Sequence, residues 1–104
     1  MKASPDNDSA FNTLGLAAYR AGQWDESIES LDRAVQMDGN RDPTNFFFLA
    51  MAHWRRGDKD EAQRLLERGA QAAKTRLVNN PEWGTFWAET ARLLGKAGPP
   101  QKPA

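Results

Sequence analysis

His53 is the only histidine of the chain, and it is the first residue to consider for acid–base catalysis or metal binding. Either role needs partner groups, and the chain has no cysteine. The carboxylates that follow, Asp58, Asp60 and Glu61, cluster where a helix is expected to begin, so helix capping explains them. The chain also lacks P-loop and G-x-S-x-G motifs. We therefore interpret His53 as a packing residue and predict a protein that is not an enzyme and uses no metal or cofactor.

A second candidate for ion chemistry is the spacing Asp38-x-Asn40-x-Asp42, which imitates the start of a calcium-binding loop. Pro43 stands where that loop needs glycine, and Leu49 stands where it needs a bidentate glutamate. The segment is instead interpreted as a connection between two helices.

The overall composition limits the classes of partner. The 104 residues contain 14 basic and 14 acidic side chains, which argues against nucleic acid or a membrane surface as the partner. The charge is divided unevenly, because the first 50 residues have a net charge of −4 and the remainder +4. The N-terminus lacks the apolar region of a signal peptide, and no apolar run is long enough to span a membrane. We expect a cytoplasmic protein or a fragment of a larger one.

Apolar spacing and helix-terminal residues predict an all-α protein of five helices with no strands. Gly22 and Gly57 are expected to end the first and third helices, since glycine adopts a left-handed conformation without strain. Pro43 and Pro81 suit the first position of the third and fifth helices. We expect a flexible N-terminus over residues 1–8, a disordered tail over 96–104, and helices over about 9–21, 24–37, 43–56, 59–78 and 81–95.

The strongest pattern is an internal repeat. When residues 11–35 are set against residues 46–70, nine of the 25 positions are identical, whereas unrelated segments would share about two. A period of this length indicates stacked supersecondary units. The identities include Leu14/Leu49, Gly22/Gly57 and the acidic residues that begin the second helix of each unit.

These residues resemble the tetratricopeptide repeat, a helix–turn–helix unit of about 34 residues. The resemblance depends most on small residues at three matched places, where the two helices of a unit cross closely: Gly15, Ser27 and Ala34 in one unit and Ala50, Ala62 and Gly69 in the other. It implies a short right-handed α-solenoid over residues 9–95, with repeats at 9–38 and 43–78 and a capping helix at 81–95.

The resemblance also implies a concave groove, lined by the first helix of each repeat, that binds a peptide or protein segment. Phe46, Leu49 and Ala50 are expected on the opposite face of their helix. The groove-facing candidates are Ser9, Asn12, Leu16, Tyr19 and Arg20 in the first repeat and Thr44, Phe47, Met51, Trp54 and Arg55 in the second.

Within that set, Tyr19, Phe47, Met51 and Trp54 are the expected apolar anchors of a ligand. The alternative is that the fifth helix covers these side chains and that they belong to the core. Since Phe47 and Phe48 are adjacent, we expect at least one of them to leave the inner face for a neighbour, the groove or solvent.

Arg20 and Arg55 are the repeated cations beside those anchors, and a guanidinium can bind a peptide carboxylate through two hydrogen bonds. The alternative is that both are solvated helix ends. Some tetratricopeptide domains bind the C-terminal carboxylate of chaperone peptides through lysine and asparagine, but the matching positions here contain no lysine. We therefore expect a less charged, more apolar ligand.

The predicted fifth helix is rich in aromatic residues. Trp83 and Phe86 are expected to pack on the second helix of the second repeat. Trp87 points about 100° away from Phe86 on a helix, so it is expected to be exposed and to contact another chain or a preceding domain. The alternative reverses this, with Trp87 buried and Trp83 at the rim.

The sequence thus predicts a protein–protein interaction module, a scaffold or adaptor whose ligand is a peptide or protein. One alternative is a structural domain that self-associates, as a homodimer or through its oppositely charged halves. Another is an accessory piece of a larger signalling protein.

Overall fold

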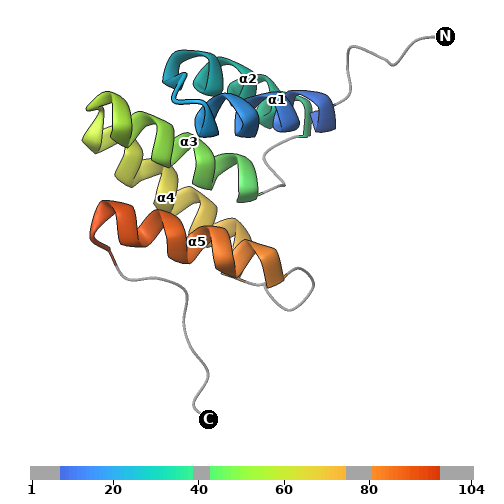
Figure 1. Ribbon diagram of the computed structural model, residues 1–104. Coiled ribbons are helices and arrows are strands. Elements are labelled where there is room, and N and C mark those ends of the chain that lie inside the picture. Colours follow the sequence, from blue (N-terminus) through green and yellow to red (C-terminus); the bar gives the residue numbers. More distant parts are fainter. Residues whose placement is uncertain (1–7, 39–42, 75–80, 97–104) are drawn as a thin grey trace, which may run out of the picture.

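The computed structural model describes residues 8–38, 43–74 and 81–96. Five helices and no strand occur in these ranges, so the all-α prediction is confirmed (Figure 1). The helices are α1 (Asp8–Arg20), α2 (Trp24–Asp38), α3 (Pro43–Arg56), α4 (Lys59–Lys74) and α5 (Pro81–Leu94).

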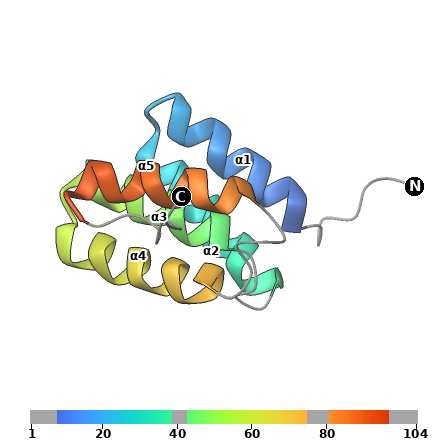
Figure 2. The same cartoon turned by 90° about the horizontal axis from the view of Figure 1, so that it is seen from below.

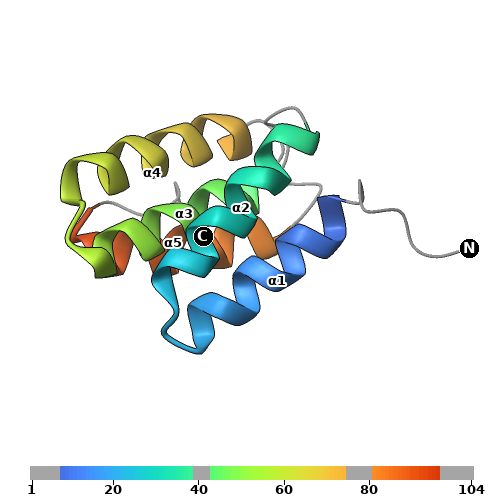
Figure 3. The ribbon, with the colours of Figure 1, turned by 90° about the horizontal axis from the view of Figure 1, so that it is seen from above.

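The helices form two hairpins and a fifth helix that stack in chain order (Figure 1). Helix α1 pairs with α2, and α3 pairs with α4. The two hairpins meet mainly through α2 and α3, and α5 packs on both α3 and α4. In the views from below and above, α1 and α4 lie on opposite sides of α3 (Figures 2 and 3). Helix α3 therefore has neighbours on several sides, an arrangement typical of a helical-repeat solenoid.

The helix ends agree closely with the sequence predictions. Pro43 and Pro81 are the first residues of α3 and α5. The predicted extension of the fourth helix to residue 78 lies outside the described residues, as do the lead-in over 1–7, the tail beyond 96 and most of the calcium-like segment.

The turns within the hairpins depend on glycine. Gly22 and Gly57 have φ angles of 80° and 100°, which a residue with a Cβ adopts only with strain. After α3, the Gly57 amide donates to the Trp54 carbonyl at 3.0 Å and the Asp58 amide donates to the His53 carbonyl at 2.8 Å. These bonds satisfy carbonyls that the end of the helix leaves without partners. The prediction that both glycines end a helix is confirmed.

Small residues allow the two helices of each hairpin to cross closely, as predicted. A Cβ added to Gly15 would lie 2.4 Å from Cγ of Leu31, a side chain that is fully buried. At the same crossing, the hydroxyl of Ser27 donates to the Gly15 carbonyl at 2.8 Å, which satisfies a buried polar group. In the second hairpin the matching residues Ala50 and Ala62 are fully buried.

The centre of the core is α3, which is buried from Pro43 to Ala52. Phe47 and Phe48 are 0% and 1% exposed. Neither ring is exposed to solvent, but the expectation that at least one of them contacts a neighbour is confirmed, because Phe48 lies against Tyr19 of the first repeat. The two rings diverge into different parts of the core, since Phe47 stacks on Trp87 of α5, whereas Phe48 meets Tyr19 of α1 and Phe86 of α5.

Candidate interaction surface

A cluster of aromatic and cationic side chains forms where α1, α2 and α3 meet. The ring of Tyr19 lies 5.3 Å from that of Trp24 and 5.6 Å from that of Phe48. Nε of Arg55 donates to the Tyr19 hydroxyl at 3.4 Å, and its guanidinium lies 5.8 Å from the Trp24 ring centroid. The guanidinium of Arg20 lies 5.9 Å from the Phe48 ring centroid. These five residues, which we call the Arg20–Arg55 surface, combine aromatic packing with two exposed cations.

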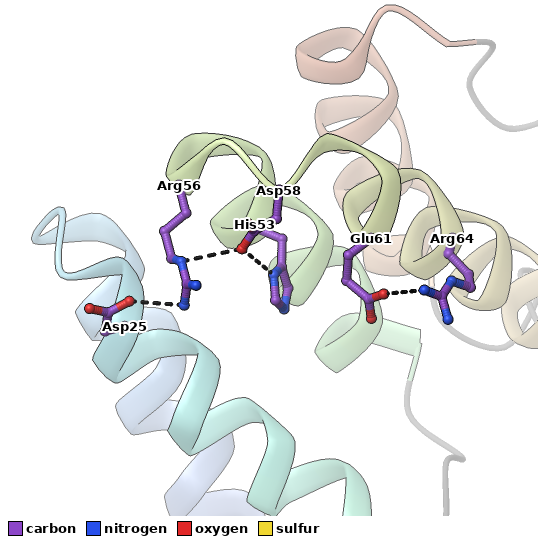
Figure 4. Close-up of polar contacts among 6 residues, drawn as sticks. All are labelled: Asp25, His53, Arg56, Asp58, Glu61 and Arg64. Carbon is purple, nitrogen blue, oxygen red and sulfur yellow. Dashed lines mark hydrogen bonds and ion pairs between the residues drawn. The ribbon is translucent and has the colours of Figure 1, made fainter.

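The charge of this surface is not neutralised locally. Carboxylates beside the α3–α4 turn pair with other cations, as Figure 4 shows: Arg56 lies 3.0 Å from Asp25 and 3.3 Å from Asp58, and Asp58 also accepts from His53 at 3.1 Å. Arg64 pairs with Glu61 at 2.6 Å (Figure 4). Within the described ranges, no carboxylate pairs with Arg20 or Arg55. Both guanidinium groups can therefore donate hydrogen bonds to a carboxylate of a ligand.

Other predicted groove residues are partly exposed and lie on the same helices. Asn12 is half-buried, and its amide donates to the side-chain oxygen of Asn45 at 2.5 Å. Leu16 is half-buried against the core. Trp54 is also half-buried, and Nζ of Lys59 lies 4.4 Å from its ring centroid. Asn12 and Leu16 lie on α1 with Tyr19 and Arg20. The Lys59 side chain lies over the Trp54 ring.

Four predicted contact residues are buried. Tyr19 is 9% exposed and packs on Trp24 and Phe48. Phe47 and Met51 are 0% exposed and Trp87 is 5% exposed, so the expectation that these residues present apolar surface to a ligand is wrong. Where α5 packs on α3 and α4, the rings of Trp87 and Phe47 stack at a centroid distance of 6.1 Å. The hydroxyl of Thr90 also donates to the Phe47 carbonyl at 3.4 Å. The alternative prediction was that the fifth helix covers the apolar groove residues, so that they belong to the core. It agrees with the burial of Phe47 and Met51.

The aromatic residues of α5 also differ from the main expectation. Trp87 faces α4, where it borders a hollow together with Ala70, and Trp83 is half-buried. The ring of Phe86 lies 5.1 Å from that of Phe48, so it packs on α3, the first helix of the second repeat. The predicted packing of Phe86 on the second helix of that repeat is therefore wrong. Thr44, another predicted groove residue, is buried, and the side chain of Ser9 lies outside the described residues.

Sequence reasoning missed two members of the Arg20–Arg55 surface, Trp24 and Phe48. A signal for Trp24 was present, because the 35-residue register pairs Tyr19 with Trp54 and Trp24 with Lys59. In both repeats the structure brings these partners together across the glycine turn. No comparable signal marked Phe48, whose neighbours come from α1 and α5.

The pKa of one carboxyl group near the junction of the repeats is shifted. Partial burial raises the pKa of Asp32 above its usual value, His53 opposes the increase and Glu61 adds to it.

The His53–Asp58 contact uses the single histidine at the α3–α4 turn. Among the described side chains, no group of three or more histidines or carboxylates is placed to hold a metal ion. None of the helices described has the length and apolar character needed to cross a membrane.

Comparison with known proteins gives one result. The family model of the tetratricopeptide repeat matches residues 6–75. The match covers both hairpins of the described structure and more than half of the chain. Searches of the curated proteins and of the solved structures found no significant match.

Proposed function

Because the chain belongs to the tetratricopeptide repeat family, we propose that it is a protein–protein interaction module that binds an acidic peptide segment at the Arg20–Arg55 surface. Tetratricopeptide repeats are generally protein–protein interaction modules, which supports the general class of function. The observation that supports this particular surface is the pair of exposed guanidinium groups on α1 and α3, neither of which has a carboxylate partner among the described residues.

The chemistry of the surface favours a particular kind of ligand. Burial of Tyr19, Phe47 and Met51 removes three of the four apolar anchors expected from the sequence, so the accessible features are the two cations, the partly exposed Leu16 and the edge of the aromatic cluster. We therefore revise the expected ligand from a mainly apolar segment to one with at least one carboxylate beside an apolar side chain. The aromatic rings hold the guanidinium groups in place, which reduces the entropy lost when a carboxylate binds.

The test is a peptide-array screen followed by calorimetric titration of the bound sequences. Peptides with a carboxylate are expected to bind, and replacing both arginines (Arg20→Ala/Arg55→Ala) is expected to weaken binding by about tenfold or more, because charge-assisted hydrogen bonds are lost. Arg55→Lys keeps the charge but loses the paired donors, so it should give an intermediate affinity.

Arg64→Ala is the matched control, because it removes another exposed arginine, whose partner is Glu61 on its own helix. This variant should bind as the original chain does. Equal affinity of the original and the double variant for every bound peptide would overturn the assignment of this surface, provided that circular dichroism shows the same helicity.

A second candidate function, self-association, is supported by one exposed residue. Leu14 is 56% exposed, whereas Leu49, its equivalent in the second repeat, is 2% exposed. Leu14 borders a hollow with Glu26 and Glu29, and the opposite end of the molecule exposes Arg92 and Lys96. A head-to-tail contact between copies would cover Leu14 and pair these charges.

Light scattering over a wide dilution series tests self-association. If copies stack head to tail, the mean molar mass should rise with concentration at low salt and fall when salt is added, since the contact is partly ionic. Leu14→Glu should then give a monomer at every concentration. A constant monomer mass of the original chain under all of these conditions would exclude this second function.

A further inference from the structure

The glycine turn that ends α5 matches the turns that end the first helix of each repeat. Helix α5 therefore has the register of a first helix. The ends of α1, α3 and α5 share one hydrogen-bond pattern. At the end of α5, the Gly95 amide donates to the Arg92 carbonyl at 3.3 Å and the Lys96 amide donates to the Ala91 carbonyl at 2.8 Å. Gly95 has a φ angle of 73°, close to the 80° of Gly22. Alignment on these glycines places Ala88 of α5 at the position of Gly15 and Ala50.

In the two complete repeats, that small residue is covered by the second helix of the hairpin. Gly15 is covered by Leu31 of α2, and Ala50 is 0% exposed beneath α4. Ala88 is only half-buried, and no further helix covers it within the described residues. Helix α5 thus has the small residue that a crossing helix needs, without that helix.

A groove lies beside this uncovered face, between α4 and α5. Its floor contains Leu66, Ala70 and Trp87. One hollow of about 220 Å³ extends from this floor toward Lys96, and another of about 410 Å³ extends toward Lys74. The two hollows share Ala70 and Trp87, so the groove is continuous along α4.

The sequence that follows α5 is poorly suited to fill this groove. In the first two repeats the second helix begins two residues after the glycine, at Trp24 and Lys59. The corresponding part of the sequence after Gly95 contains Pro99, Pro100 and Pro103. Proline in a helix interior removes a hydrogen bond and clashes with the preceding turn.

The rim of the groove indicates the charge of an occupant. Arg68, Lys74 and Lys96 are exposed along it, and Glu67 is the acidic side chain among them. An occupant with acidic side chains would therefore be attracted electrostatically and oriented by this rim.

We propose that the α4–α5 groove binds an acidic amphipathic helix of a partner protein, which completes the third repeat in trans. By analogy with α2 and α4, the helix has a small residue, a leucine four positions later and a second small residue three positions after that, as in Ser27-Leu31-Ala34 and Ala62-Leu66-Gly69. This site is separate from the Arg20–Arg55 surface, so either can fail without the other.

The chain itself provides a probe of this chemistry. A synthetic peptide with the sequence of residues 24–38 has the required pattern and carries five acidic residues and one basic residue. A side-chain crosslink that replaces Glu29 and Arg33, both exposed in the structure, would keep it helical and leave four acidic residues and no basic residue. The full chain is titrated into the fluorescently labelled peptide, and anisotropy reports binding.

The peptide is expected to bind with 1:1 stoichiometry, and its Leu31→Asp version is expected not to bind. Reversing two rim charges (Lys74→Glu/Lys96→Glu) should weaken binding by about tenfold, since attraction is replaced by repulsion at two exposed positions. Both lysines are exposed, so these substitutions should leave the fold intact. The matched control Arg33→Glu/Arg64→Glu reverses two exposed charges that belong to neither proposed site, and this variant should bind the peptide normally.

Three outcomes would overturn the proposal. The first is no binding of the peptide at any concentration reached. The second is binding that the lysine reversals leave unchanged, which would mean that the peptide binds elsewhere, at the Arg20–Arg55 surface or in place of α2. The third is a dimer without peptide that the same lysine reversals dissociate, which would make a second copy the occupant.

Discussion

Replacing Phe47 by alanine is expected to lower the free energy of unfolding by about 3–5 kcal/mol, the usual cost of removing a buried phenylalanine. The side chain is fully buried, stacks on Trp87 and lies against Gly69, where an added Cβ would approach the ring to 2.8 Å. Since a domain is stabilised by about 5–15 kcal/mol in total, this single change should remove a large part of the stability. Urea denaturation followed by circular dichroism measures it.

Met37→Ala is a suitable control for this experiment, because Met37 is 37% exposed and its truncation should change stability little. The prediction also separates a core residue from a binding residue. A Phe47→Ala chain that keeps its stability but loses peptide binding would show that the ring contacts the ligand, in contradiction to its burial.

Replacing Gly15 by alanine is expected to destabilise the protein by about 1–3 kcal/mol, the usual cost of overpacking a core. On helix propensity alone, the same change would stabilise a helix by about 1 kcal/mol. Packing is expected to outweigh propensity because the new Cβ would lie 2.4 Å from Leu31 Cγ and 2.6 Å from its Cδ2. The hydrogen bond from Ser27 to the Gly15 carbonyl would be disturbed by the same separation of the helices.

A double-mutant cycle with Leu31→Ala tests this explanation. Without the leucine side chain the clash disappears, so Gly15→Ala should become neutral or stabilising in that background. Unfolding is measured in a sucrose-containing buffer, which favours the folded state of the weakened variants. If Gly15→Ala costs the same in both backgrounds, the close approach of α1 and α2 does not explain the glycine.

The features that were predictable from the sequence depend on local chemistry. Gly22, Gly57, Pro43 and Pro81 specify helix ends through backbone conformations that few other residues adopt, so their positions followed directly. The small residue at each helix crossing was predictable from the repeat itself, because Gly15 and Ala50 recur at one register.

The distinction between core and surface was less predictable, because it depends on contacts between distant segments. Phe47 and Met51 occupy positions that the resemblance assigns to an open groove, but both are fully buried, and Phe47 lies against Gly69 of α4 and Trp87 of α5. Trp83 and Trp87 lie on one helix, and helical spacing alone did not tell which of the two α4 would cover.

The register of α5 was hidden for a related reason. The glycine that ends α5 follows Gly57 by 38 residues, whereas Gly57 follows Gly22 by 35. A search at the fixed 35-residue period therefore does not align α5 with α1 and α3. The shared hydrogen bonds at the three helix ends reveal the relation.

Chemical-shift mapping by NMR during titration with an acidic peptide from the array screen tests the central claim most directly. That claim is that the buried aromatic residues maintain the fold while the exposed arginines bind the ligand. The largest perturbations are expected at Arg20, Arg55 and Leu16, with the Phe47 and Met51 side chains little changed. Dominant perturbations at Phe47 and Met51, with α5 displaced from α3, would contradict it and restore the apolar groove as the binding site.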